Sequence, residues 1–231
     1  MFDALFTTTT EYKKLSHALS GKGACALFGL PASGRAQVYA ALCRQLDKPL
    51  CIVTPGEAEA TRFAADLNTL GIPAAVFPAR DYVLRPIEGT AREYEYRRLA
   101  VLGELVGGRL RAVAVPAEAL TQFTTPKEDF CANTRTLHAG DTLLRDDLLA
   151  ALFGAGYTRR AQVDGPGQFS VRGDIVDIFA PDQKMPVRME FWGDEIDTLH
   201  TFDLTTQRRE DAIDKFYLSP AREVLFGKPA D

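Results

Sequence analysis

Two glycines open the stretch with the clearest chemical pattern in the sequence. Residues 29–36 read GLPASGRA, and Gly29 and Gly34 follow the spacing of the phosphate-binding loop GxxxxGK[ST]. In that loop a lysine reaches the nucleotide phosphates and a hydroxyl side chain holds Mg²⁺. Here Arg35 occupies the lysine position and Ala36 occupies the hydroxyl position. Because alanine cannot coordinate a metal, the pattern predicts a degenerate loop that does not hydrolyse ATP.

A working ATPase also needs an acidic residue at the end of a buried strand to hold the magnesium ion. The apolar run at 111–115 is followed by Pro116-Ala117-Glu118, without an aspartate. Asp194-Glu195 follows a strand whose residues alternate between apolar and polar, so that strand is half exposed. We interpret Asp194-Glu195 as a solvated hairpin turn and predict no catalytic residue. The loop itself is either an anion site at a helix N-terminus or a turn retained for packing.

Three arginines form a second pattern, which suggests binding. Arg159, Arg160 and Arg172 lie within residues 126–213, which hold 10 Lys and Arg against 16 Asp and Glu, a net charge of −6. These arginines are therefore a local exception in an acidic region. The guanidinium group binds carboxylates through two hydrogen bonds and is enriched at the energetic centres of interfaces, so the cluster predicts a protein-docking surface.

The surroundings of the arginines leave alternatives open. If residues 157–163 and 169–172 pair as neighbouring strands, the arginines could share one face of a sheet. Alternatively, each arginine forms an ion pair with a local acid, for which the candidates are Asp164, Asp174 and Asp177. Phe169 and Phe179 are either interface anchors or core residues.

A third stretch combines aromatic and basic residues, which are Tyr82, Arg85, Arg92, Arg97 and Arg98. One interpretation of this composition is a surface that contacts DNA. A solvated helix face has the same composition when acids balance it, and Glu88, Glu93 and Glu95 are interspersed here. We favour the solvated helix face.

The first 125 residues alternate between short apolar runs and capped helical patterns. We expect strands at 24–28, 50–54, 74–77 and 111–115. We expect helices at 8–20, capped by Thr8, at 35–46, at 55–70, capped by Thr54, and at 90–106. Continuous apolar strands separated by helices are typical of a parallel sheet with helices on both faces. Residues 1–125 are therefore predicted to form an α/β domain.

The pattern changes near Thr124. One helix is expected at 143–153, and after it apolar and polar residues alternate as in half-buried antiparallel strands. Gly173 predicts a bulge or tight bend within one of these strands. Residues 126–213 are therefore predicted to form a small α+β domain with an antiparallel sheet, and residues 214–231 a short segment without a complete element.

Composition excludes several classes of protein. The chain has 231 residues and a net charge of −4, so it lacks the basic footprint of most nucleic-acid-binding domains. Its four cysteines form no CxxC pair and its three histidines stand alone, which predicts no metal site and buried free thiols. No stretch reaches the ~20 apolar residues of a membrane span. We expect a protein of a reducing cytoplasm.

The stretch at 156–181, GYTRRAQVDGPGQFSVRGDIVDIFAP, resembles the second domain shared by the bacterial repair protein UvrB and the transcription-repair coupling factors (Mfd). The resemblance continues through VRMEFWGDEIDTLHTFDLTTQR at 187–208 and LSPAREVLF at 218–226. The strand-and-helix pattern of residues 1–125 is similar to the first domain of those proteins. The resemblance thus covers nearly the whole chain, and GQFSVRGDIVDIF is its most specific part.

Two features make the coupling factors the better match. UvrB has an intact phosphate loop and a damage-probing β-hairpin, whereas here the loop is degenerate and the chain passes directly from Phe77 to the helix at Thr90. The resemblance implies domains 1A and 2 of a coupling factor, with 214–231 a truncated return toward domain 1B. The full-length parent is then expected to be an ATP-dependent DNA translocase, which contacts DNA and RNA polymerase through its other domains.

The resemblance also implies a partner. The family's second domain docks UvrA, the damage-recognition ATPase, and its docking arginines fall on Arg159 and Arg172. Further arginines of UvrB are replaced here by Pro166 and Ser170. The implied function is a non-catalytic module of nucleotide excision repair in the bacterial cytoplasm, without cofactor, that recruits UvrA and makes masking contacts with the rest of its parent. The alternatives are a UvrB-type, nucleotide-dependent DNA-damage enzyme and a nucleotide sensor without hydrolysis.

Overall fold

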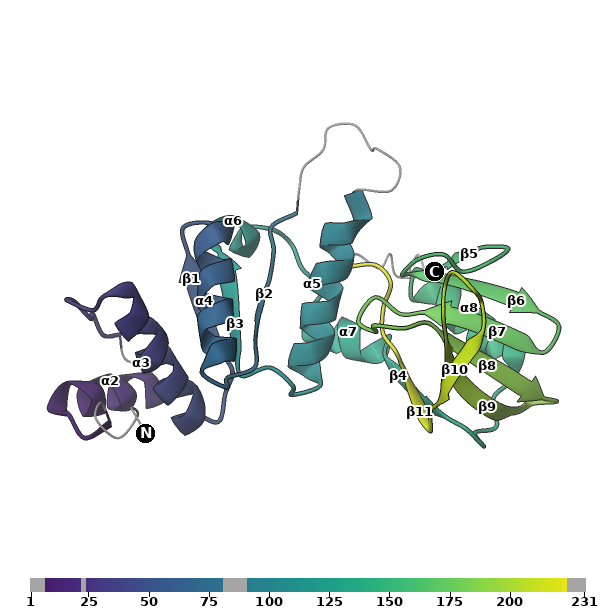
Figure 1. Cartoon of the computed structure of the whole chain (residues 1–231), viewed down its shortest axis with the longest axis horizontal. Coiled ribbons are helices and arrows are strands. Elements are labelled where there is room, and N and C mark those ends of the chain that lie inside the picture. The colour runs from purple at the N-terminus through teal and green to yellow at the C-terminus, as the bar shows by residue number, and fades with distance from the viewer. Residues whose placement is uncertain (1–6, 22–23, 81–90, 224–231) are drawn as a thin grey trace, which may run out of the picture. The chain divides into compact units, whose positions relative to one another are not determined.

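The computed structural model describes residues 7–21, 24–80 and 91–223. The chain divides into two compact units (Figure 1). Unit 1 comprises Met1–Ala79 and Gly107–Gln122, and unit 2 comprises Arg80–Val106 and Phe123–Asp231. This division is based on contacts between residues, and each unit is made of two separate segments of the sequence. The domain boundaries after residues 125 and 213 stay predictions.

Unit 1 contains a three-stranded parallel sheet in the order β1-β3-β2 (Figure 1). Its strands are β1 (Leu50–Thr54), β2 (Ala74–Val76) and β3 (Ala112–Pro116). They fall where the apolar runs predicted them, with ends that differ by a residue or so. The amide of Asn68 donates to the carbonyl of Ala74 at 2.8 Å and accepts from its N–H at 3.1 Å, which ties the helix before β2 to that strand.

Two helices, α3 (Ala32–Gln45) and α4 (Glu57–Thr69), pack against one face of this sheet. The contact is made largely by small side chains, among them Ala40, Ala60, Ala112 and Ala114. A further helix, α2 (Thr10–Ser20), packs on α3, and the short α6 (Ala117–Leu120) follows β3. The Thr9 hydroxyl caps α2 by accepting from the N–H of Tyr12 at 3.2 Å, one residue beyond the cap expected from sequence.

The strand expected at 24–28 is absent, and this prediction is wrong. These five residues pair with no strand, and their side chains are exposed, with Phe28 88% accessible. An apolar run becomes a strand only if a neighbour takes up its backbone hydrogen bonds and covers its side chains. In addition, α3 begins at Ala32, so Gly34 lies inside a helix and the loop is shorter than expected.

Unit 2 is built around a six-stranded sheet in the order β10-β9-β8-β7-β6-β5 (Figure 1). The strands are β5 (Thr158–Arg159), β6 (Gln168–Arg172), β7 (Ile175–Phe179), β8 (Val187–Trp192), β9 (Glu195–Phe202) and β10 (Arg209–Ala212). All neighbours are antiparallel except β5 and β6, which are parallel. Gly173 turns between β6 and β7 with φ +61°, which confirms the predicted tight bend.

Apolar residues of one face of this sheet form the main core of unit 2 with α8 (Arg145–Gly154). Phe169, Val176, Met189 and Leu199 lie in it, together with Leu148 and Leu152 of the helix. The remaining elements of unit 2 are α5 (Ala91–Val106), α7 (Lys127–Ala132), β4 (Arg135–His138) and β11 (Lys215–Leu218), of which β4 and β11 pair antiparallel. A parallel α/β sheet followed by an antiparallel α+β arrangement is therefore confirmed.

The part of the chain that the structure describes has neither a membrane-spanning helix nor a metal site. No helix there is long and apolar enough to cross a membrane, and no group of His, Cys, Asp or Glu side chains is arranged to hold a metal ion. Of the four free cysteines Cys43 is buried, whereas Cys25, Cys51 and Cys131 are exposed, so the expectation of buried thiols fails for three of them.

Candidate interaction surface

Arg159 and Arg160 lie at the edge of the six-stranded sheet. Arg159 ends β5 opposite Phe169, and the N–H of Arg160 donates to the carbonyl of Phe169 at 2.8 Å. Both side chains are exposed, and neither has a hydrogen bond or ion pair with another described residue. An exposed guanidinium held on a paired strand without a partner is free to bind a carboxylate.

The register separates the arginines that the sequence grouped together. Residues opposite each other on paired strands point to the same side of a sheet, and successive residues alternate. Arg159 therefore lies on the side of Phe169, and Arg172, three residues further along β6, lies on the other. Arg160 follows Arg159 and falls on the side of Arg172. β5 and β6 are neighbouring strands, paired at Thr158–Arg159 and Gln168–Phe169, but Arg159 and Arg172 do not share a face.

Arg172 belongs to an ion-pair network across the sheet. Its Nη2 lies 2.6 Å from Oδ2 of Asp177, and the other oxygen of that carboxylate accepts from Nε of Arg188 at 2.7 Å. Asp177 is almost fully buried, and Arg188 also stacks on the ring of Phe202, 4.7 Å from its centre. The hydrogen bond to Asp177 raises the pKa of Arg188. Local pairing, one of the alternatives from sequence, thus applies to Arg172, whose side chain is still 47% exposed.

Phe169 and Phe179 are buried. Phe169 is fully inaccessible and meets Phe153 of α8 edge to face, with ring centres 5.2 Å apart. Phe179 packs with Val163 and Phe202 in a smaller cluster on unit 2. Both side chains therefore serve the core in this structure, and neither is accessible as an interface anchor.

Arg98, which the sequence assigned to a basic surface stretch, is fully buried, so that assignment is wrong. Its Nε and Nη2 donate to the carboxylate of Glu223 at 2.8–3.0 Å, and Arg80 donates to the same carboxylate at 3.1 Å. Burial raises the pKa of Glu223, but hydrogen bonds from Arg98, Thr124 and Arg80 outweigh it and lower the pKa overall. This network joins α5 to the chain beyond β11.

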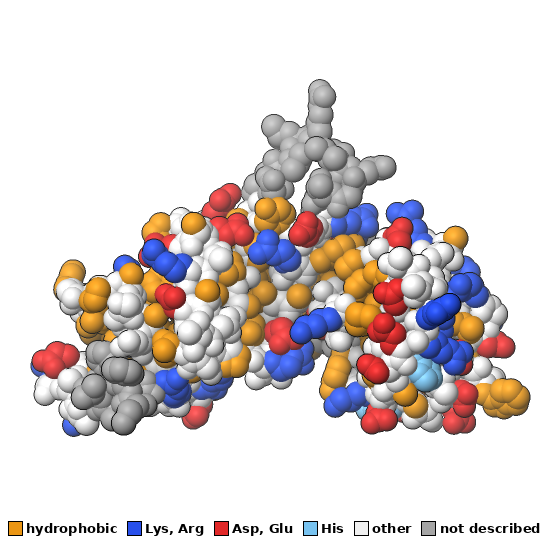
Figure 2. All heavy atoms as spheres, in the orientation of Figure 1, with side chains coloured by type: hydrophobic (Ala, Val, Ile, Leu, Met, Phe, Trp, Pro, Cys, Tyr) orange, Lys and Arg blue, Asp and Glu red, His pale blue; other side chains and the backbone are white. Residues whose placement is uncertain are grey.

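The other members of that stretch are only partly described. Tyr82 and Arg85 lie outside the described residues. Arg92 and Arg97 are exposed on α5, and the guanidinium of Arg97 lies over the ring of Tyr94, 5.7 Å from its centre. On the face of unit 2 seen in Figure 2, basic side chains are interspersed with acidic ones.

In the segment at 29–36, Arg35 is turned toward α4. Its Nη1 lies 3.6 Å from Oε1 of Glu59, and its guanidinium lies over the ring of Phe63 at 5.6 Å. Ala36 is 3% exposed and belongs to the core of unit 1. Gly29 has φ +82°, a conformation that favours glycine. Arg35 therefore faces α4, and Ala36 faces the core of unit 1.

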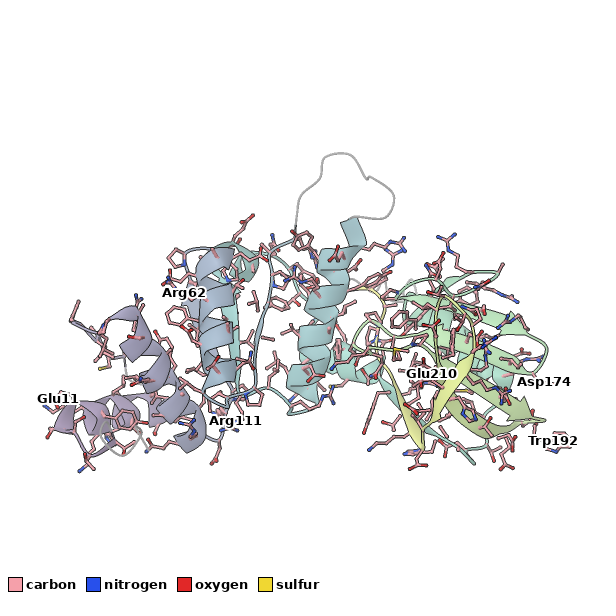
Figure 3. The ribbon with its side chains drawn as sticks, viewed as in Figure 1. Glu11, Arg62, Arg111, Asp174, Trp192 and Glu210 are labelled. Atoms are coloured by element: carbon pink, nitrogen blue, oxygen red, sulfur yellow. The ribbon has the colours of Figure 1, made fainter. Side chains whose placement is uncertain are left out.

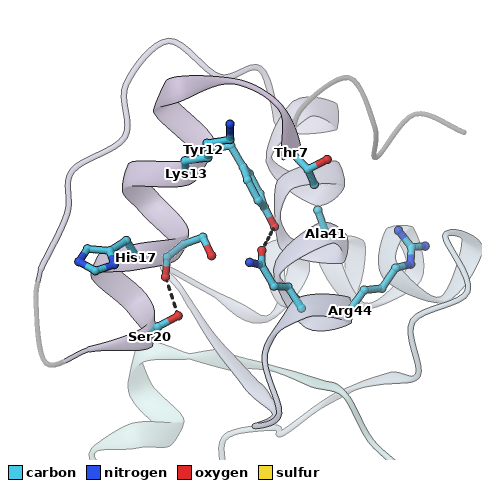
Figure 4. Close-up of a pocket in the computed structure, with 9 residues that line it drawn as sticks. Thr7, Tyr12, Lys13, His17, Ser20, Ala41 and Arg44 are labelled. Carbon is cyan, nitrogen blue, oxygen red and sulfur yellow. Dashed lines mark hydrogen bonds between the residues drawn. The ribbon is translucent and has the colours of Figure 1, made fainter.

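Two features of the structure were not predicted from the sequence. Trp192, the single tryptophan, projects from the tip of the β8–β9 hairpin and is 82% exposed (Figure 3). In unit 1, a cavity of about 520 Å³ lies between α2 and α3, lined by hydroxyl, amide and basic side chains, among them Lys13, His17 and Arg44 (Figure 4). The available signal was the helical spacing of polar residues on α2, namely Lys13, Ser16, His17 and Ser20, but their partners on α3 lie far away in sequence.

Comparison with known proteins identifies relatives of most of the chain. Residues 136–224 match the family described as the UvrB interaction domain. The chain is 28% identical over 201 residues to the transcription-repair-coupling factor of Bacillus subtilis, covering 86% of this chain and 17% of that protein. It is 35% identical over 208 residues to the transcription-repair-coupling factor of Myxococcus xanthus, covering 85% and 17%.

A relative of another type is the UvrABC system protein B of Chlorobium limicola, 28% identical over 217 residues, which covers 87% of this chain and 32% of that protein. The chain spans about a sixth of the length of the two coupling factors it matches.

Proposed function

We propose that the chain is the UvrB-like N-terminal region of a transcription-repair-coupling factor and acts as a non-catalytic interaction module that recruits UvrA in nucleotide excision repair. Its similarity to transcription-repair-coupling factors and the match of residues 136–224 to the UvrB interaction domain support this proposal. The observation that carries the proposal is the pair of exposed arginines, Arg159 and Arg160, without partners among the described residues. They lie within the matched range 136–224 and on a sheet edge of an otherwise acidic region.

The geometry adds detail to this docking surface. Arg159 and Arg160 project to opposite sides of the edge strand β5, so a partner that engages both wraps the edge of the sheet. Arg172 contributes from the β6–β7 turn, where Asp177 fixes its position at 2.6 Å. Holding a long side chain in one rotamer before binding reduces the entropy lost on association. The core positions of Phe169 and Phe179 leave the arginines as the proposed contacts.

The proposal that the module is non-catalytic and needs no cofactor has support in unit 1. Arg35 contacts Glu59 and Phe63, Ala36 is packed in the core, and residues 24–28 form no strand ahead of the loop. These features fit a degenerate phosphate loop in a domain derived from the first domain of UvrB. They argue against a UvrB-type, nucleotide-dependent DNA-damage enzyme. The same proposal includes contacts with DNA and RNA polymerase through other domains of a longer parent protein. It also includes contacts within that parent that mask the docking surface, and a location in the bacterial cytoplasm.

The test is calorimetric titration of the chain with UvrA of the same organism. We expect binding by the parent chain and a loss of about 2 kcal/mol or more in an Arg159→Ala/Arg172→Ala variant, the size expected for interface hot spots. Circular dichroism establishes that the variant is folded. Arg135→Ala, at an exposed arginine of β4, serves as the matched control and should bind as the parent does. Absence of binding by the parent chain would overturn the proposal.

A further inference from the structure

A cleft in unit 2 lies where α5 meets the loop between β5 and β6. It has a volume of about 640 Å³ and is lined by Arg92, Tyr96, Arg160, Asp164, Pro166 and Gln168, with Gly165. A second cavity of about 440 Å³ shares Tyr96 and Pro166 with the first and is otherwise lined by Glu93, Arg97, Ala100 and Pro181. The two cavities therefore adjoin along α5, and we refer to them together as the groove.

The walls of this groove are fixed by close packing. Gly167 has φ +72°, and a Cβ at this position would lie 2.6 Å from the hydroxyl oxygen of Tyr96. The ring of Tyr96 is thus seated directly on the backbone of the loop. Gln168 holds the same loop through its Oε1, which accepts from the N–H of Asp164 at 3.0 Å. The N–H of Gly167 donates to the carbonyl of Phe179 at 2.7 Å, which anchors the loop to the sheet.

The chemistry of the groove changes along its length. Arg92 and Arg160 are exposed in the larger cavity, and neither has a hydrogen bond or ion pair with another described residue. Two unpaired guanidinium groups at one cleft favour an occupant with a carboxylate. The adjoining cavity offers an aromatic ring, two prolines and Ala100, which suit an apolar side chain.

A protein segment fits this groove better than a nucleic acid does. Phosphate groups recur at every step of a nucleic-acid backbone, and Asp164 and Glu93 would repel the phosphates next to any that the arginines bound. The surrounding residues 126–213 also carry a net charge of −6. A protein segment with one carboxylate beside an apolar side chain meets both parts of the groove without that repulsion.

We propose that this groove extends the docking surface for UvrA onto α5, where it binds a segment of UvrA that carries a carboxylate next to an apolar side chain. The inference rests on the proposed function, because it takes UvrA as the partner. Arg160 links the two regions, since it belongs both to the edge of the sheet and to the groove. Arg92 lies outside residues 136–224, so the matched interaction domain contains only part of the binding surface.

The experiment measures UvrA binding by calorimetry for the whole chain and for the variants Arg92→Ala, Arg92→Lys and Arg160→Ala. We expect Arg92→Ala to weaken binding about tenfold, which corresponds to about 1.4 kcal/mol. Arg92→Lys should recover part of the loss, because lysine keeps the charge but not the two-pronged hydrogen bonding. The double variant Arg92→Ala/Arg160→Ala should lose less than the product of the single effects, because both arginines hold one carboxylate.

The controls separate this inference from the function on which it rests. Arg135→Ala should bind as the parent does. If Arg92→Ala also binds as the parent does while Arg159→Ala/Arg172→Ala is weakened, the groove is not part of the surface and the proposed function stands. If the parent chain does not bind UvrA, both proposals fall. Arg92 is exposed and unpaired among the described residues, so its removal should leave the unfolding transition unchanged.

Discussion

The loop at 29–36 in unit 1 and the strands around Arg172 in unit 2 were both recognised from short sequence patterns. Only the second pattern is flanked by the secondary-structure elements that the sequence predicted. The β6–β7 hairpin forms with Gly173 at the turn, and its register places Arg172 beside Asp177. In unit 1 residues 24–28 form no strand, and α3 begins before Gly34. A motif predicts chemistry only when the elements on both sides of it form as well.

The two units also differ in how they hold charged side chains. In unit 1, Arg35 and Arg62 make partly exposed ion pairs with Glu59. In unit 2, Glu223 and Asp177 are nearly inaccessible and each binds two arginines. Exposed pairs contribute little to stability, whereas removal of one partner of a buried pair is costly. The stability of unit 2 should therefore depend far more on single charged residues.

The largest effect is expected for Arg98→Ala, which leaves the carboxylate of Glu223 buried without its main partner. We expect the free energy of unfolding of unit 2 to fall by about 3–5 kcal/mol. Urea denaturation followed by circular dichroism measures it. The control is Arg145→Ala, which removes an exposed pair with Asp174 and should cost less than about 1 kcal/mol. Equal effects of the two variants would contradict the contrast between buried and exposed pairs.

Asp177→Asn should have the next largest effect. The substitution keeps the shape of the side chain but leaves the guanidinium of Arg188 buried without a counter-charge, which we expect to cost about 1–3 kcal/mol of unfolding free energy. Asp174→Asn is the matched control, because the carboxylate of Asp174 is 80% exposed. A loss in Asp177→Asn no greater than in this control would show that Arg172 and Arg188 do not depend on the carboxylate.

A smaller effect should appear as a dependence of stability on pH. The pKa of Glu223 is lower in the folded chain than its ordinary value of 4.5, so the folded state favours the ionised form. Its contribution to stability is present above about pH 4.5 and is lost as the pH falls through the lowered pKa. Glu223→Gln should therefore lose less stability than the parent between pH 7 and pH 3.5, although it is less stable at pH 7. If the stability of Glu223→Gln and that of the parent fall equally between pH 7 and pH 3.5, the ionised carboxylate of Glu223 does not have this role.

Local patterns predicted the parts of the fold that depend on local burial. The apolar run at 50–54 forms β1 as expected, because both the sheet and α4 cover its Ile52. The capping threonine of α2 was misplaced by one residue, because Thr8 and Thr9 have the same chemistry. The failure at 24–28 has a different cause, since composition does not show whether a neighbouring strand is available.

The candidate site was predictable in its residue types but not in its pairings. Arg159, Arg160 and Arg172 were found because basic residues are unusual in an acidic region. The burial of Arg98 was missed, because its partner Glu223 lies 125 residues away in sequence. The opposite directions of Arg159 and Arg172 depend on the register of β5 against β6, and a strand of two residues gives no periodic signal. Both the burial of Arg98 and the directions of Arg159 and Arg172 depend on contacts between residues that are distant in sequence, which the spacing of residues does not show.

The last prediction concerns the loop at 29–36, where the smallest change in activity is expected, and it tests the other half of the comparison. Arg35→Lys/Ala36→Thr restores the two side chains of a working phosphate loop. We expect no ATP hydrolysis with Mg²⁺, measured as phosphate release, because position 36 is packed in the core and position 35 faces Glu59 and Phe63. The substitution of Ala36 should instead cost about 1–3 kcal/mol through overpacking. Restored hydrolysis would show that side-chain identity alone had silenced the loop. Micromolar Mg²⁺-dependent ATP binding by the parent would favour the enzyme alternative.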